Sequence, residues 1–317
     1  MLTLDDIVAA RRATASRLHR TPMLRSSTLA AMTGTDLLLK AECFQKTGSF
    51  KPRGVLNKIR HLSPEEKQRG LITFSAGNHA QAVAYAAAAE GIPATVVMPA
   101  AAVRSKVEAA RGYGAEVVLH GEMTQIFARA EELRRERNLT FVHPFDDPIV
   151  IAGQGTVGLE ILDEVPDLRV AVVPVGGGGL ISGIAAALKL SRPDVRVYGV
   201  EPMTAAAMAQ SLAAGRPVRL EQVRTVADGL AAPFAGEHTY ALVSRFVDGI
   251  ITVPDDAIVR AMRLVMERCK VVVEPAGAAG VAALLSGQIP EARGARTVCV
   301  LSGGNVDLDQ LRTLLGA

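Results

Sequence analysis

The sequence predicts an α/β fold in which open, mostly parallel twisted sheets are flanked by helices. Short apolar runs alternate along the chain with segments of helical pattern, which is typical of parallel α/β architectures. The apolar runs are not interrupted by polar residues, as expected of strands that helices cover on both faces. In addition, the block of residues 70–145 repeats strand–helix units and could form a small sheet of its own.

Strands are expected wherever a short apolar run is bounded by turn residues. The expected strands are Leu37–Ala41, Leu71–Phe74, Ala94–Met98, Glu116–Leu119, Thr140–His143, Val170–Val173, Val195–Val200, Gly249–Val253 and Thr297–Leu301. We therefore expect a small domain at residues 70–145 and a large domain made of residues 1–69 and 146–317. The segment Gly153–Thr156 is interpreted as a turn that opens a helix.

The N-terminal segment has the pattern of a helix start. Thr3 followed by Asp6 matches a capping box, and Asp5 and Asp6 stand where a secretory signal would be basic and then apolar. No apolar stretch reaches the roughly 20 residues that are needed to span a bilayer. We therefore expect a soluble, cytoplasmic protein that does not act on membranes.

The composition allows a sizeable core and gives no sign of nucleic-acid binding. Of the 317 residues, 49% are hydrophobic, while the net charge is only +3 and the charged residues are scattered. The cysteines Cys43, Cys269 and Cys299 lack the spacing of a metal site and cannot all pair, which favours a reducing compartment.

Lys51 is the first candidate for a reactive side chain. It lies in the tight segment Gly48–Gly54, and Pro52 behind it suits the first turn of a helix. The pattern therefore predicts that Lys51 sits where a loop becomes a helix, with its amine held and partly desolvated. A desolvated lysine can lose its proton and act as a nucleophile.

A glycine-rich segment forms the second candidate. Gly176, Gly177, Gly178 and Gly179 follow the apolar run Val170–Val173 and precede an Ala- and Leu-rich helical pattern. Exposed backbone N–H groups at the start of a helix bind phosphate well. No Lys-Ser/Thr pair follows the glycines, and no third glycine completes a dinucleotide-binding pattern, so a nucleotide is not indicated.

A lysine amine together with a phosphate cradle suggests pyridoxal 5′-phosphate. The chain resembles fold-type II pyridoxal-phosphate enzymes of the tryptophan synthase β-like fold, and within them the serine/threonine dehydratases, or threonine ammonia-lyases, which are related to serine racemases. The resemblance covers nearly the whole chain. It is carried by Thr21-Pro22, Lys51, Ser75–His79, Gly176–Gly179, Glu274–Gly277 and Ser302–Asn305. It implies a cofactor in the cleft between two domains, where ligand sites usually lie, and a homodimer.

The resemblance implies a role for each motif. Lys51 would bind the cofactor aldehyde and then take the α-proton of the substrate, and Phe50 would pack beside the cofactor. The glycines at 176–179 would hold the phosphate. Ser302 would bond the pyridine nitrogen, and a neutral hydroxyl there makes the ring a weaker electron sink, which suits elimination. The loop expected to bind the substrate carboxylate comprises Ser75, Ala76, Gly77, Asn78 and His79.

Some residues of these motifs have more than one interpretation. Asn78 would also contact the ring hydroxyl of the cofactor, although Ser75 or Asn78 could instead cap a helix. The side chain of His79 is expected to be structural. Glu274 and Asn305 are expected near the cofactor, without an assigned role in proton transfer.

Two departures from the family pattern sharpen the expectation. Serine racemases resemble this chain but carry a serine at the position of Ala76, which supplies a proton on the face opposite the lysine; alanine has none to give. Several relatives also bind a divalent ion near the positions of Glu201, Ala205 and Ala207. The loss of a carboxylate at Ala207 weakens such a site, so no metal is expected.

The expected function is therefore α,β-elimination of water from threonine or serine, after which the resulting enamine tautomerises and is hydrolysed to a 2-oxo acid and ammonia. A serine racemase-like enzyme and a dehydratase of another β-hydroxy amino acid, such as 3-hydroxyaspartate, are alternatives. A non-catalytic sensor of the cofactor or of an amino acid is an alternative from a different class, but it would not need Lys51.

Overall fold

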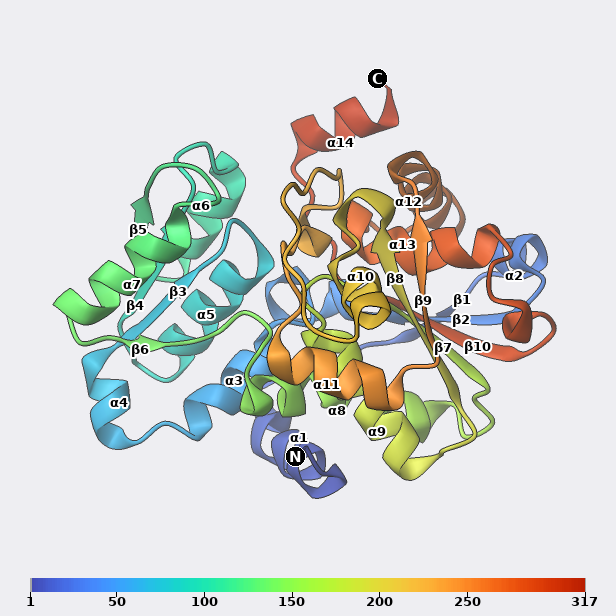
Figure 1. Cartoon of the computed structure of the whole chain (residues 1–317), viewed down its shortest axis with the longest axis horizontal. Helices are drawn as coiled ribbons and strands as arrows, with labels where there is room; N and C mark the ends of the chain where they lie inside the picture. Colours follow the sequence, from blue (N-terminus) through green and yellow to red (C-terminus); the bar gives the residue numbers. More distant parts are fainter. Residues whose placement is uncertain (1, 317) are drawn as a thin grey trace.

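The computed structural model describes residues 2–316 and contains two sheets, each in its own lobe (Figure 1). The larger sheet has the order β1 (Met23–Arg25), β2 (Asp36–Ala41), β10 (Arg296–Leu301), β7 (Val170–Pro174), β8 (Arg196–Pro202) and β9 (Gly249–Val253). The smaller sheet has the order β5 (Glu116–Leu119), β4 (Ala94–Met98), β3 (Leu71–Phe74) and β6 (Thr140–Phe141). Every pair of neighbouring strands is parallel except β1 with β2.

The predicted fold class is confirmed, and each of the nine expected strands is present with ends that shift by at most two residues. The short antiparallel strand β1 was not predicted. Its three residues, Met23–Arg25, are too few and too polar at the end to stand out as an apolar run.

Helices cover both faces of the large sheet (Figure 1). On one face lie α1 (Leu4–Thr14), α8 (Pro148–Glu164), α9 (Gly179–Ser191), α10 (Ala207–Ala214) and α11 (Glu237–Phe246). On the other face lie α2 (Ser27–Thr33), α12 (Asp255–Cys269), α13 (Pro275–Leu285) and α14 (Leu308–Leu315). Burial on both faces explains why the strands are continuous apolar runs.

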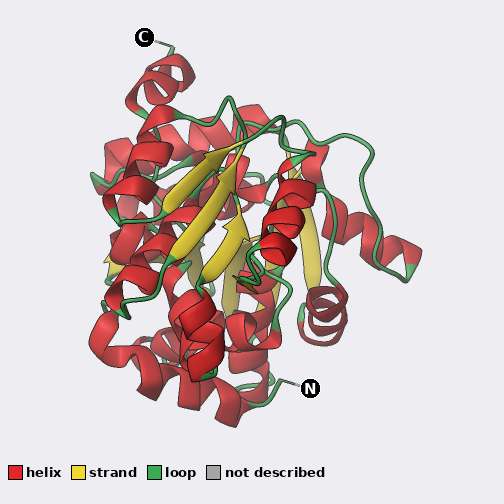
Figure 2. Ribbon diagram, turned by 90° about the vertical axis from the view of Figure 1, so that its left-hand side faces the viewer, coloured by secondary structure: helices red, strands yellow, loops and turns green. Residues whose placement is uncertain are grey.

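The small sheet, whose lobe faces the viewer in Figure 2, is also covered on both faces. Helices α3 (Pro52–Arg60), α5 (Asn78–Ala89) and α6 (Arg104–Gly112) pack on one side, and α7 (Ile126–Glu136) packs on the other. Helix α4 (Pro64–Arg69) leads from α3 into β3. We propose residues 70–145 as the small domain and residues 1–69 with 146–317 as the large one, because all four strands of the small sheet fall in that range.

The interpretation of Gly153–Thr156 as a turn was wrong, because these residues lie inside α8. Their glycines serve close helix crossings instead. A Cβ atom on Gly153 would collide with the carbonyl oxygen of Arg53 in α3. A Cβ atom on Gly155 would lie 2.9 Å from the carbonyl oxygen of Gly183 in α9. Helix α8 therefore packs closely against both neighbouring helices.

The predicted start of the first helix is confirmed. Thr3 is the N-cap of α1, and its side chain and that of Asp6 form a reciprocal capping box. Among residues 2–316, no helix combines the length and apolar character required to cross a membrane. The three cysteines are free thiols.

Candidate active site

The predicted site residues follow the carboxyl ends of parallel strands. The segment with Lys51 follows β2, the glycine loop follows β7, Ser302 follows β10, and the loop with Asn78 follows β3. In open α/β sheets, ligands bind at this edge of the sheet. A β-bridge between Ser49 and Gly303 and a hydrogen bond from the Phe50 N–H to the Ser302 carbonyl (3.1 Å) join two of these segments.

Lys51 lies at the N-cap of α3, directly before Pro52, as the sequence predicted. Its Nζ donates a hydrogen bond to the carbonyl oxygen of Pro144 at 2.7 Å and lies 5.1 Å from the centroid of the Phe50 ring. Burial disfavours the charged form and lowers the pKa of Lys51 to about 8. A substantial neutral fraction near physiological pH makes this amine a competent nucleophile and base.

The lowered pKa of Lys51 leads to a testable pH dependence. Only the neutral amine attacks an aldehyde, and its fraction rises about tenfold per pH unit below the pKa. We expect the rate at which the apoprotein takes up pyridoxal phosphate to rise with pH and to level off above about 8. Stopped-flow absorbance across a pH series would measure this rate. A plateau that begins only near the ordinary lysine pKa would show that the amine is not desolvated.

The glycine loop follows Val175 at the end of β7, leads into α9 and carries no side chain of its own. Gly178 has φ +92°, a conformation that favours glycine, and α9 begins at Gly179. The first N–H groups of a helix have no partner within it, so they are available to an anion. A Cβ atom on Gly177 would collide with ring carbons of Phe145, and one on Gly176 would lie 3.0 Å from the carbonyl oxygen of Gly229. The loop is therefore closely packed as well as bare.

Replacing Gly177 by alanine is expected to weaken cofactor binding by about tenfold or more. The new methyl group would collide with the Phe145 ring, and overpacking of this kind costs about 1–3 kcal/mol. Titration of the apoprotein with pyridoxal phosphate measures the effect. Gly112→Ala is the matched control, since its Cβ atom would meet nothing within 4 Å. Equal affinity in the two variants would argue against a cofactor at this loop.

The segment Ser75–His79 connects β3 to α5. Helix α5 begins at Asn78 with Gly77 as its N-cap, and no side chain caps it. Ser75 instead accepts a hydrogen bond from the Gly77 N–H on its Oγ atom, at 3.1 Å. The first N–H groups of α5 therefore face the cleft without a side-chain cap, which suits an anionic group such as a carboxylate.

His79 is buried below this loop. Its Nε2 atom lies 3.1 Å from the carbonyl oxygen of Val142, and burial holds the pKa of His79 well below its ordinary value. The imidazole is therefore neutral, and its contact with a backbone carbonyl fixes the ring.

Asn78, Glu274 and Asn305 form one hydrogen-bonded chain, although they come from distant parts of the sequence. Asn78 donates from Nδ2 to Glu274 Oε1 at 2.6 Å. Asn305 donates from Nδ2 to Asn78 Oδ1 at 2.8 Å and to the carbonyl oxygen of Thr47 at 2.6 Å. Burial raises the pKa of Glu274 to about 7. The sequence predicts that these three residues lie near the cofactor. The structure joins their side chains to one another through Asn78.

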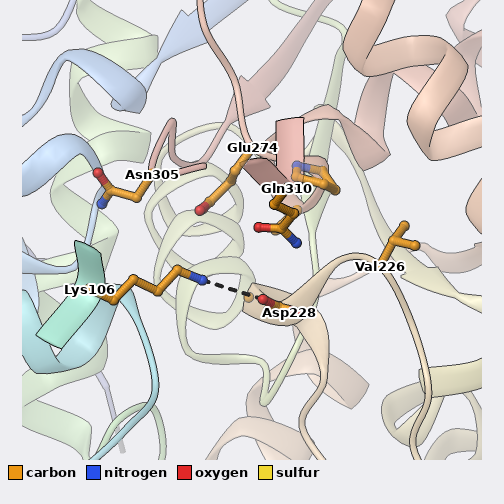
Figure 3. A pocket seen from close by; sticks show the side chains of 9 residues that line it. Lys106, Val226, Asp228, Glu274, Asn305 and Gln310 are labelled. Atoms are coloured by element: carbon orange, nitrogen blue, oxygen red, sulfur yellow. Dashed lines mark hydrogen bonds and ion pairs between the residues drawn. The ribbon is translucent and has the colours of Figure 1, made fainter. Parts of the chain in front are cut away.

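Several contacts at the cleft were not predicted from the sequence. Lys106 of α6 pairs with Asp228 at 3.3 Å, and both line a small cavity of about 10 Å³ together with Glu274 and Asn305 (Figure 3). Ser105 and Asp307, beside them, share a hydrogen bond of 2.8 Å that joins the two lobes. No sequence motif marks these pairs, because each is set only by how the lobes meet.

The side chain of Glu201 is hydrogen-bonded to backbone N–H groups. Its carboxylate accepts hydrogen bonds from the N–H groups of Met208 and Ala209 at 2.8 Å each, at the start of α10. Burial raises the pKa of Glu201 to about 7. Within residues 2–316, no three His, Cys, Asp or Glu side chains are grouped so that they could hold a metal ion.

The family model for pyridoxal-phosphate dependent enzymes matches residues 15–303. The chain is 46% identical to an L-threonine ammonia-lyase of Thermotoga maritima over 99% of this chain and 78% of the relative. It is 44% identical to a catabolic L-threonine dehydratase of Staphylococcus aureus over 98% of this chain and 91% of the relative.

Solved structures of related enzymes superpose closely on this chain. Maize serine racemase superposes with a TM-score of 0.95 at 41% identity, covering 99% of this chain and 97% of that chain. The processed form of threonine deaminase isoform 2 from Solanum lycopersicum superposes with a TM-score of 0.94 at 37% identity, covering 99% of this chain and 91% of that chain. This chain belongs to the family of pyridoxal-phosphate dependent enzymes.

Proposed function

We propose that this protein is a pyridoxal-phosphate dependent ammonia-lyase that converts L-threonine or L-serine to a 2-oxo acid and ammonia. The observation that carries the proposal is the buried amine of Lys51, which donates to the Pro144 carbonyl among the strand-end loops of a pyridoxal-phosphate dependent family. Relatives named for threonine ammonia-lyase and threonine dehydratase activity support this choice of substrate.

The residues at the cleft fit pyridoxal phosphate. Lys51 offers an amine with a lowered pKa, and the loop Gly176–Gly179 offers a cradle without side chains at the start of α9. We propose that Lys51 holds the aldehyde, that these glycines hold the phosphate, and that Asn78 and the buried Ser302 hold the ring. When bound, the cofactor supplies an electron sink for the α-carbon of the substrate.

The protein's own groups would then carry the proton and the substrate carboxylate. The neutral Lys51 amine would accept the α-proton, because its lowered pKa leaves it partly unprotonated near pH 7. The N–H groups at the start of α5 would bind the carboxylate.

The nature of residue 76 favours elimination over racemisation. Racemisation needs a proton donor on each face of the substrate, and Ala76 has no proton to give. The superposition on maize serine racemase does not decide between the two reactions, because one fold hosts both. The choice therefore depends on the residues around the reacting carbon.

An assay of oxo acid and ammonia on a panel of β-hydroxy amino acids tests the proposal. The panel includes L-threonine, L-serine and 3-hydroxyaspartate, and both enantiomers are followed. Oxo acid from threonine or serine is the expected result. Interconversion of enantiomers without oxo acid would contradict the proposal, as would cofactor binding without turnover of any panel member.

Replacing Ala76 by serine is expected to add racemisation of serine to the elimination. The new hydroxyl would stand at the position where the resembling racemases carry a proton donor. Chiral chromatography of serine incubated with both proteins measures the D-enantiomer. Ala80→Ser, in the first turn of α5, is the matched control. The absence of D-serine in the Ala76→Ser variant would mean that another group decides between the reactions.

We also propose that the protein is a homodimer and acts in the cytoplasm. The free cysteines support a reducing compartment, and the family resemblance supports the dimer. Light scattering of the purified protein tests the dimer, since a single chain has a mass of 33.3 kDa. A mass that corresponds to one chain would contradict the dimer.

A further inference from the structure

The chain of hydrogen bonds through Asn78 joins the two lobes at the cleft. Asn78 is the first residue of α5, beside the small sheet, whereas Glu274 precedes α13 and Asn305 follows β10. Figure 3 shows Glu274 and Asn305 among the residues that line the small cavity. The Asn78 side chain is thus held from both ends by groups of the large lobe.

The donor and the acceptor of each hydrogen bond in this series follow from the chemistry of the groups. The carbonyl oxygen of Thr47 can only accept, so the Asn305 atom that faces it is the amide nitrogen, at 2.6 Å. The same nitrogen also faces Asn78, and because it can only donate, the facing Asn78 atom is Oδ1. The other end of the Asn78 amide, which faces Glu274, is therefore the nitrogen Nδ2.

Two glycines leave room for the side chains of Asn305 and Glu274. A Cβ atom on Gly48 would collide with Oδ1 of Asn305, and Gly48 has φ +70°. A Cβ atom on Gly303 would collide with Oε1 of Glu274. Glycine is therefore needed at both positions for the two groups to reach Asn78.

We propose that Asn305 and Glu274 are positioning residues that fix the Asn78 amide so that it offers the cofactor ring hydroxyl an N–H group and not a carbonyl. The inference rests on the proposed function and deepens it. One N–H of Asn78 Nδ2 goes to Glu274, and the second remains for the ring oxygen. A donor at this place stabilises the ionised form of the ring oxygen, whereas a carbonyl would destabilise it.

The charged groups around Glu274 bear on its role as the acceptor of the hydrogen bond from Asn78. Burial raises the pKa of Glu274 to about 7, while Lys106 and Lys51 favour its ionised form and Asp228 opposes it. The thiol of Cys43 also faces it, and burial raises the pKa of Cys43 to about 12, so this thiol is neutral. An ionised Glu274 accepts strongly from Asn78, because a hydrogen bond to a charged acceptor is stronger than a neutral one.

The test uses two isosteric variants and reads the bound cofactor without substrate. Asn305→Asp replaces the donor by acceptors, and Glu274→Gln replaces the carboxylate by an amide. Titration of each apoprotein with pyridoxal phosphate gives the dissociation constant, and the visible absorbance across pH gives the midpoint at which the ring hydroxyl ionises. Ser105→Ala is the control, since it breaks another contact between the lobes without touching the chain.

Asn305→Asp is expected to weaken cofactor binding by about tenfold or more and to raise the absorbance midpoint, because the Asn78 amide would turn. Glu274→Gln is expected to bind more weakly than the wild type above pH 7 and to approach it below, since the wild-type carboxylate is then protonated. Ser105→Ala is expected to match the wild type within about twofold. Thermal melting confirms folding, and Glu274→Gln carries the test if Asn305→Asp does not fold.

The inference would be overturned if both isosteric variants kept the absorbance midpoint of the wild type and bound pyridoxal phosphate within about twofold of its affinity. The contacts of Asn305 and Glu274 would then serve only to hold the two lobes together. Equal losses in these variants and in Ser105→Ala would overturn it as well. The proposed function fails separately: a wild-type protein that binds the cofactor but turns over no β-hydroxy amino acid contradicts the lyase activity, and the absorbance measurements still decide the role of Asn305 and Glu274.

Discussion

Replacing Lys51 by alanine is expected to lower oxo-acid formation by roughly 10⁴-fold or more, because one amine serves both to hold the cofactor and to take the α-proton. The Nζ atom donates to the Pro144 carbonyl, and the neighbouring Pro52 starts α3, so the amine is positioned by rigid backbone on both sides. The same variant should lose its cofactor on dialysis, since no covalent bond to the protein would remain.

The control for this prediction is Lys46→Ala. Lys46 precedes the site by five positions in the same segment, and its replacement removes one lysine charge without removing the desolvated amine. Rates of oxo-acid formation and retention of absorbance after dialysis are compared for both variants. Substantial activity of Lys51→Ala, or an equal loss in Lys46→Ala, would show that the amine at position 51 is not the reacting group.

The sequence allowed the architecture to be predicted because buried parallel strands must be continuous apolar runs. Strands such as β3 and β4 occur where the runs predicted them, since helices cover both of their faces. Glycine is less informative, because it serves two purposes. At Gly178 it permits a turn with positive φ, whereas at Gly153 it permits a close helix crossing. The sequence pattern does not separate these uses, and this is why α8 was interpreted wrongly at that point.

The site was predictable only where a local motif carries it. Lys51 and the glycine loop have local signatures, because a helix start and a bare turn depend on adjacent residues. The partners of these motifs come from elsewhere. The carbonyl that binds Lys51 belongs to Pro144, which is 93 positions away, and the partner of Lys106 is 122 positions away. Such contacts depend on how the lobes meet, and no local pattern encodes that.

The largest loss of stability is expected from the replacement of Arg53, which lies two residues after Lys51. Its side chain is 1% exposed and makes paired hydrogen bonds of 2.7 and 2.8 Å to Glu42, which is fully buried. It makes another pair of 2.7 and 3.0 Å to Glu160. Arg53→Met would remove the paired hydrogen bonds of both carboxylates and leave Glu160 its ion pair with Lys40 at 2.8 Å, at a cost of about 3–5 kcal/mol.

The pH dependence of this loss identifies its cause. Burial alone would raise the pKa of Glu160, but the hydrogen bonds and charge of Arg53, followed by those of Lys40, outweigh burial and hold the pKa below the ordinary value. A group with a lowered pKa stabilises the fold above its unfolded pKa, and the contribution is lost as pH falls through the folded pKa. The difference in unfolding free energy between wild type and Arg53→Met should therefore be largest near neutral pH and should shrink in acid.

Denaturant unfolding of the apoprotein at several pH values measures this difference. The double variant Arg53→Met, Glu42→Gln should recover part of the loss, because it removes the stranded charge of Glu42 while Glu160 keeps its ion pair with Lys40 at 2.8 Å. Arg104→Ala serves as the surface control, since its ion pair with Glu108 is exposed and should change stability little. If the double variant were no more stable than Arg53→Met, lost packing of the long arginine side chain would explain the effect, and the buried charge of Glu42 would not.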